Sequence, residues 1–230
     1  MVSEIQVLNE IECGNVRTAV HDCKHTWIRR ELFAPFYTLA IASYIDAKGT
    51  LGLTYGKRAQ SYNTILRDTF QPLYARVAEA LTDELKAPIE YDQRFAIPGF
   101  HIFQAHETFG LDRGSVHCDL QYALLDWEQK IPEAIPISFT LTIALPQAGA
   151  GLWVWDLTQP EIAKLNTNEI KQLAARNPKT FHAYSMGKMV IHSGHQVHQI
   201  APMPDMVPGD ERLTLQGHGL LVDGVWRLYW

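Results

Sequence analysis

A histidine and an aspartate two positions apart, His117 and Asp119, are the first residues of this 230-residue sequence whose types and spacing could bind a cation. Strand residues two positions apart point to the same face, so an imidazole nitrogen and a carboxylate oxygen here could hold one metal ion together. Taken alone the pattern has little specificity. The chain has 10 histidines, so a chance His-x-Asp triplet is common, and an isolated instance is more often a polar surface pair.

Three further histidines, His192, His195 and His198, follow one another at intervals of three. A helix that would align them on one face is broken at Gly194, because glycine is a weak helix former. We expect instead a strand that ends at a Ser-Gly turn and a second strand over residues 197–200, which begins near His198. On a strand His195 and His198 point to opposite sides, so at most one or two of the three histidines reach the same metal.

The third candidate is Arg212, which opens a predicted strand in which Leu213 and Leu215 are the apolar alternate positions. Arg212 and Thr214 then point to the opposite face, which in a barrel is the interior. A buried arginine is costly unless it meets an anion, and its planar guanidinium matches a carboxylate through two parallel hydrogen bonds. The alternative is an internal salt bridge with a neighbouring carboxylate such as Glu211 or Asp210.

The sequence pattern changes from helical to strand-like near residue 88. This change predicts which elements position the candidate metal ligands and Arg212. Residues 1–88 are predicted to be a mainly helical layer, with helical patterns over 15–47 and 57–86 that are interrupted at Pro35 and Pro72. Residues 89–230 are predicted to form a β-rich core with a helical insertion near 160–176. The strands expected there cover residues 90–97, 100–107, 115–122, 137–145, 152–157, 180–184, 188–191, 197–200, 212–221 and 225–229.

Asp223-Gly224, between the last two predicted strands, is typical of a type I′ hairpin turn, which needs positive φ at both central residues. Many short strands at regular spacing favour a barrel or double sheet packed against helices, so the fold class is α+β. The length favours one catalytic domain over residues 1–230.

Composition excludes several classes of protein. The net charge is -5, so the chain offers no basic field for a nucleic-acid backbone. Its first residues lack the basic start of a secretory signal, and no apolar run reaches the roughly 18 residues of a membrane span. The three cysteines, Cys13, Cys23 and Cys118, have no paired spacing. These features favour a cytoplasmic protein with reduced thiols and no membrane or nucleic-acid partner; the oligomeric state stays open.

The order His-x-Asp, then a glycine-led strand, then His198, then Arg212 resembles that of the iron(II) and 2-oxoglutarate-dependent dioxygenase superfamily. In that family the distal histidine follows the pair by some tens of residues, here 198 − 117 = 81, and the cosubstrate arginine lies shortly beyond it, here 212 − 198 = 14. Arg212-Leu-Thr214 is similar to the Arg-x-Ser pair of some members, with threonine in place of serine. The resemblance covers residues 98–221.

The resemblance implies a double-stranded β-helix, a jelly-roll or cupin-like barrel, packed against N-terminal helices. It implies that His117, Asp119 and His198 bind Fe(II), a facial triad that leaves coordination positions open, and that Arg212 and Thr214 bind 2-oxoglutarate. The family couples the conversion of 2-oxoglutarate and dioxygen to succinate and carbon dioxide with the oxidation of an unactivated C–H bond. Members that halogenate carry a small residue at the carboxylate position, so Asp119 favours hydroxylation or a related oxidation. An acidic chain of this size favours a small-molecule substrate, such as an amino acid or natural-product intermediate.

Two other interpretations remain open. One is a cupin-like metalloenzyme without 2-oxoglutarate that uses His117, His195 and His198, which predicts no role for Arg212. The other is a small-molecule-binding barrel whose metal site has lost its function. Incubation with iron(II), 2-oxoglutarate and oxygen, followed by measurement of succinate, separates all three.

Overall fold

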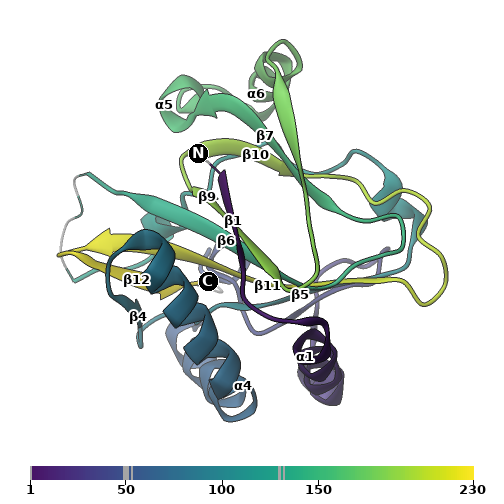
Figure 1. Ribbon diagram of the computed structural model, residues 1–230. Coiled ribbons are helices and arrows are strands. Elements are labelled where there is room, and N and C mark those ends of the chain that lie inside the picture. Colours follow the sequence, from purple (N-terminus) through teal and green to yellow (C-terminus); the bar gives the residue numbers. More distant parts are fainter. Residues whose placement is uncertain (1, 49–51, 53, 129–130, 132) are drawn as a thin grey trace.

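The structure is a computed structural model that describes residues 2–48, 52, 54–128, 131 and 133–230. Over these residues two β-sheets form successive layers, and the long helices pack on the outer side of the larger sheet (Figure 1). None of the described helices is both long and apolar enough to cross a bilayer.

In the described residues the larger sheet has nine strands and the smaller has three. The main path of the larger sheet runs through β1 (Val2–Gln6), β9 (Lys188–Ser193), β6 (Pro136–Ala144), β11 (Glu211–Val222), β5 (Gly99–Gln104), β3 (Phe36–Leu39) and β2 (Ile28–Arg29). Beyond this path, β12 (Val225–Tyr229) pairs with the second half of β11, and β4 (Ile89–Tyr91) pairs with β12. The smaller sheet has the order β10 (Gln196–Ile200), β7 (Gly151–Thr158) and β8 (Lys179–Ala183).

The described helices are α1 (Glu10–Asp22), α2 (Ser43–Asp46), α4 (Tyr55–Leu85), α5 (Gln159–Ile162) and α6 (Thr167–Ala175), with short 3-10 turns η1 (Lys24–Thr26), η2 (Glu107–Gly110) and η3 (Gln121–Leu124). A capping box between Asn9 and Glu12 starts α1. Helix α4 continues through Pro72 and is kinked at Phe70, whose φ of -122° is not helical. Proline removes a helical hydrogen bond, and the α4 residues on both sides of the kink still pack against the sheet.

The main core lies between the larger sheet and helices α1 and α4. Strand residues with the same alternate spacing, among them Leu213 and Leu215 of β11, join helix residues such as Leu66 and Val77 in one buried apolar cluster. The intervening residues of β11 therefore face the other layer. This alternation confirms the predicted facing of Arg212, which is 1% exposed on the inner side of the sheet.

Several sequence-based expectations hold for the local elements. The helical insertion is present as α5 and α6, with Asn166 as the N-cap of α6. Asp223 and Gly224 have φ angles of 50° and 78°, as the predicted hairpin turn between β11 and β12 requires.

Three expectations are wrong. The strand predicted over residues 90–97 ends at Tyr91, and a turn follows it. The helical stretch predicted over residues 15–47 ends at Asp22, and the N-terminal part also supplies β1, β2 and β3 to the larger sheet. β1 and β3 pair with β9 and β5, which lie far along the chain, and β2 pairs with β3. Residues 115–122 do not form a strand. They form one isolated bridge, His117 with His198, before η3 begins at Gln121.

Candidate active site

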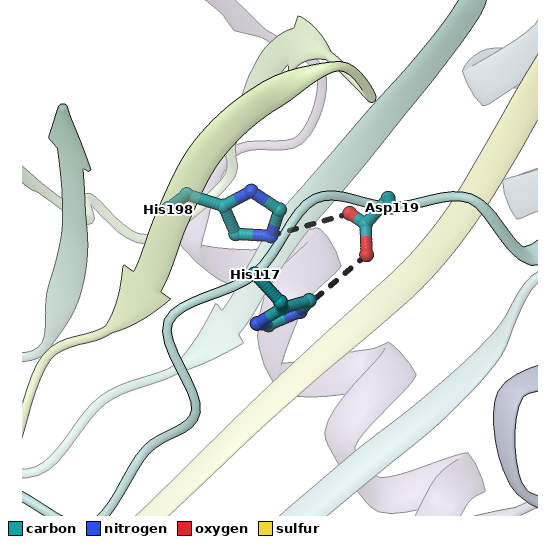
Figure 2. Close-up of side chains that lie close together, drawn as sticks. All are labelled: His117, Asp119 and His198. Carbon is teal, nitrogen blue, oxygen red and sulfur yellow. Dashed lines mark ion pairs between the residues drawn. The ribbon is translucent and has the colours of Figure 1, made fainter. Parts of the chain in front are cut away.

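The structure brings His117, Asp119 and His198 together in the interior between the two sheets. Nε2 of His117 lies 3.5 Å from Oδ1 of Asp119, and Nε2 of His198 lies 3.3 Å from Oδ2. One ligating atom of each residue falls within 4.8 Å of the others. Figure 2 shows both imidazoles turned toward the carboxylate, His198 from β10 and the other two residues from the segment beside it. Two nitrogen donors and one carboxylate facing a common point are suitable ligands for a first-row metal ion.

Backbone pairing holds these residues in register. The amide and carbonyl of His117 exchange hydrogen bonds of 3.0 and 2.9 Å with those of His198, and the amide of Asp119 donates to the carbonyl of Gly194 at 2.7 Å. A Cβ atom on Gly194 would lie 2.9 Å from the carbonyl oxygen of Asp119 and 2.9 Å from Cβ of Pro136. The glycine that breaks the histidine run thus also lets the Asp119 backbone approach the turn between β9 and β10.

Both histidines are held in the tautomer that a metal ligand needs. Nδ1 of His117 lies 2.8 Å from the carbonyl oxygen of Ser115, and Nδ1 of His198 lies 2.9 Å from that of Gln196. A carbonyl only accepts, so each Nδ1 carries a proton, and each Nε2, the nitrogen that remains for a metal, is turned toward Asp119. The His117 side chain is 42% exposed, so it marks the side of the site that is open to solvent.

Asp119 is buried, and two further side chains hold its carboxylate. Gln121 donates from Nε2 to Oδ1 at 2.8 Å, and the hydroxyl of Ser138 donates to Oδ2 at 2.6 Å. Ser138 in turn lies 3.0 Å from Nδ1 of His218. Burial acts to raise the pKa of Asp119, but the adjacent imidazoles, led by His198 and His218, hold that pKa well below its usual range. Asp119 is therefore a carboxylate at neutral pH, as a metal ligand must be.

Arg212 is fully buried on the inner face of β11, and no carboxylate of the described residues pairs with it. Its Nε and Nη1 have no hydrogen-bond partner among the described residues, and the same is true of the hydroxyls of Thr214 and of Thr142, the residue opposite Thr214 on β6. The guanidinium carbon lies 5.2 Å from the ring centre of Phe103 and 5.3 Å from that of Tyr184. Burial lowers the pKa of Arg212, but arginine remains charged in proteins. A buried cation with two free donors is a binding site for an anion.

Two alternatives from the sequence do not agree with this arrangement. Glu211 does not pair with Arg212; it lies on the other side of β11, where Arg17 and His21 of α1 bind it at 3.1 and 3.0 Å. His195 is not in the metal-ligand group, and its Nε2 faces the hydroxyl of Tyr122 at 3.5 Å. A site built from His117, His195 and His198 is therefore not the one that the described residues form.

The sequence alone did not identify Ser138 or His218 as members of the site. One signal was present. Ser138, Thr140 and Thr142 alternate with apolar residues along β6, and in a strand buried on both faces such polar positions indicate an interior with polar contents. Only the pairing of β6 with β11 places Ser138 opposite His218 and beside Asp119.

Ser138→Ala is expected to weaken metal binding about 10- to 100-fold, the usual effect of losing a hydrogen bond that orients a ligand. Co(II) titration of the protein, followed by its absorption bands, measures the affinity. Ser193→Ala is the matched control, because the Ser193 hydroxyl accepts from the backbone of His195 and does not contact Asp119. Equal Co(II) affinity in the two variants would contradict a positioning role for Ser138.

No protein-family model and no curated protein sequence matches this chain. Similarity is found among solved structures. An N-substituted L-amino acid dioxygenase from Burkholderia ambifaria AMMD has 14% identity and a TM-score of 0.64, covering 100% of this chain and 86% of its own. EvdO2 from Micromonospora carbonacea var. aurantiaca, in complex with 2-oxoglutarate, has 17% identity and a TM-score of 0.51, covering 95% and 85%.

A third similar structure is SnoN, a non-haem α-ketoglutarate-dependent epimerase from nogalamycin biosynthesis, with 12% identity, a TM-score of 0.53 and coverage of 94% and 76%. At these identities the likeness concerns the fold. It confirms the predicted α+β double-stranded β-helix and the resemblance to iron(II) and 2-oxoglutarate-dependent dioxygenases, which was predicted for residues 98–221 and extends in structure over the full chain.

Proposed function

We propose that this protein is an iron(II)- and 2-oxoglutarate-dependent oxygenase that hydroxylates a small molecule. One observation carries the proposal: a charged, buried Arg212 with two free donors lies on the inner face of the barrel that also holds the group of His117, Asp119 and His198. Either feature alone has a structural explanation. Together they fit a cosubstrate with a metal-chelating end and a carboxylate at the other end.

The side chains at this site suit both Fe(II) and 2-oxoglutarate. His117, Asp119 and His198 would hold Fe(II), since two neutral imidazoles and a carboxylate are a usual ligand set for this ion. Arg212 would bind the distal carboxylate of 2-oxoglutarate through Nε and Nη1, and Thr214 would add a hydroxyl donor. When bound, iron and 2-oxoglutarate supply the oxidation chemistry, with succinate and carbon dioxide as products.

The protein's own residues orient these groups and restrict water. Ser138 and Gln121 fix the Asp119 carboxylate, and the backbone carbonyls of Ser115 and Gln196 fix the two imidazoles. Phe103 and Tyr184 enclose the Arg212 guanidinium, so the anion is bound away from bulk solvent, where a charge-assisted pair is stronger. His117, the exposed member of the group, marks the side from which the substrate enters.

The proposed substrate is a small molecule such as an amino acid or a natural-product intermediate. Support for the first class comes from the fold neighbour that acts as an N-substituted L-amino acid dioxygenase. N-substituted L-amino acids are therefore the first panel to test. A hydroxylated product would have a mass increased by one oxygen atom.

Anaerobically purified protein supplied with Fe(II), 2-oxoglutarate and dioxygen is expected to form succinate above the level of a metal-free control. Mass spectrometry of the substrate panel after turnover then identifies the oxidised molecule. A protein that binds Fe(II) but forms no succinate with any panel member or with a metabolite extract would refute the proposed function and favour a binding barrel.

A further inference from the structure

Tyr44 lies on the short helix α2, and its hydroxyl is directed at a buried histidine of the inner sheet face. Its phenol oxygen is 2.6 Å from Nε2 of His101, and the two rings meet edge to face with centres 6.1 Å apart. His101 is on β5, and in the register of the sheet it lies directly opposite Thr214 on β11. Opposite residues on one face have Cβ atoms about 5 Å apart. The Tyr44 and His101 pair therefore adjoins the free Thr214 hydroxyl.

Buried ion pairs hold the short helix α2 against the rest of the fold. Ala40, the residue directly after β3, has φ of 90°, a left-handed value that costs a non-glycine residue about 1–3 kcal/mol. Asp46, at the end of α2, is 1% exposed and binds both Arg30 and Arg58 at 2.7 and 2.9 Å. A four-residue helix has no stability of its own. The ion pairs of Asp46 therefore hold α2, and with it Tyr44, in place despite the strained backbone at Ala40.

The Tyr44 phenol lies within electrostatic range of both Arg212 and Asp119. Burial raises the pKa of this phenol to a value above that of free tyrosine, with Arg30 and Arg212 opposing this rise and Asp119 and Asp46 adding to it. Burial, followed by the charge of Arg212, holds the pKa of His101 well below its usual range, so His101 is neutral. A neutral imidazole can donate from Nε2 to the phenol oxygen and leave the phenol proton available to a ligand.

We propose that Tyr44, oriented by His101, donates a hydrogen bond to the distal carboxylate of 2-oxoglutarate beside Arg212 and Thr214. The inference rests on the proposed function, since it assigns a further residue to the same cosubstrate. Tyr44 is a binding residue that comes from the N-terminal part of the chain, outside the region that carries the sequence resemblance. His101 is a positioning residue that acts through the Tyr44 hydroxyl.

Tyr44→Phe removes the hydroxyl and keeps the ring. It is expected to raise the dissociation constant of 2-oxoglutarate about tenfold, the loss of one hydrogen bond to a charged group. The measurement is a titration of 2-oxoglutarate into anaerobic Fe(II) protein, followed by its metal-to-ligand charge-transfer band. The affinity for oxalate, which chelates a metal through adjacent oxygens and has no distal carboxylate, should not change. Fe(II) affinity without any cosubstrate should not change either.

Tyr55→Phe is the matched control, because the Tyr55 hydroxyl is also buried and, among the described residues, forms hydrogen bonds with the backbone of Trp230 and Ala96. It should lower stability and leave the 2-oxoglutarate affinity at the wild-type value. Unchanged 2-oxoglutarate affinity in Tyr44→Phe, or an equal loss for oxalate, would overturn the assignment. If the wild-type protein bound Fe(II) but not 2-oxoglutarate, the proposed function itself would fail.

Discussion

Arg212→Gln is expected to weaken 2-oxoglutarate binding about 30-fold or more while leaving Fe(II) binding intact. Arg212 is 1% exposed, and its Nε and Nη1 have no other partner among the described residues, so the bound carboxylate would be its only counter-charge there. Removing one member of a buried charge pair costs about 2–5 kcal/mol, and about 1.4 kcal/mol corresponds to a factor of ten. Glutamine keeps one donor and loses both the charge and the second donor.

The same charge-transfer titration measures this effect. Arg212→Lys should recover only part of the affinity, because an ammonium is a point charge and the guanidinium offers two parallel donors. Thr214→Val should show a smaller defect, since it removes one hydroxyl and no charge. Wild-type affinity in Arg212→Gln would mean that the arginine is structural, and a metalloenzyme without 2-oxoglutarate would become the leading interpretation.

Asp119→Ala is expected to reduce metal affinity and substrate oxidation by more than about 100-fold, the upper range for losing a residue that only orients a ligand. The change removes the only carboxylate of the ligand group. It also leaves the Ser138 hydroxyl and the Gln121 amide without the acceptor that they now share. Arg212 remains, so an anion can still be attracted to the barrel interior.

Co(II) titration measures the loss of metal affinity, and product formation from the identified substrate measures the loss of oxidation. Asp156→Ala is a suitable control, because Asp156 is an exposed carboxylate on β7. It should leave both quantities at the wild-type level. An Asp119→Ala protein that retained near-wild-type oxidation would remove Asp119 from the metal site.

The sequence alone determined features that depend on neighbouring residues. Alternation along β11 was enough to place Leu213 and Leu215 on one face and Arg212 on the other, because side chains in a strand alternate strictly. Asp223-Gly224 predicted its turn because few other residue pairs accept positive φ at both positions. Gly194 likewise separated the histidines correctly, since it could not continue a helix through them.

Tertiary structure decided everything that depends on pairing between distant segments. β1 has no strong pattern of its own and becomes a strand by pairing with β9, whereas residues 115–122 have a strand-like pattern and find only a single bridge. The positions of Ser138 beside Asp119 and of Tyr44 beside His101 follow from sheet register and from the packing of α2. Local propensity does not contain this information, because the free energy of a strand or a buried polar contact comes from partners that only the folded chain supplies.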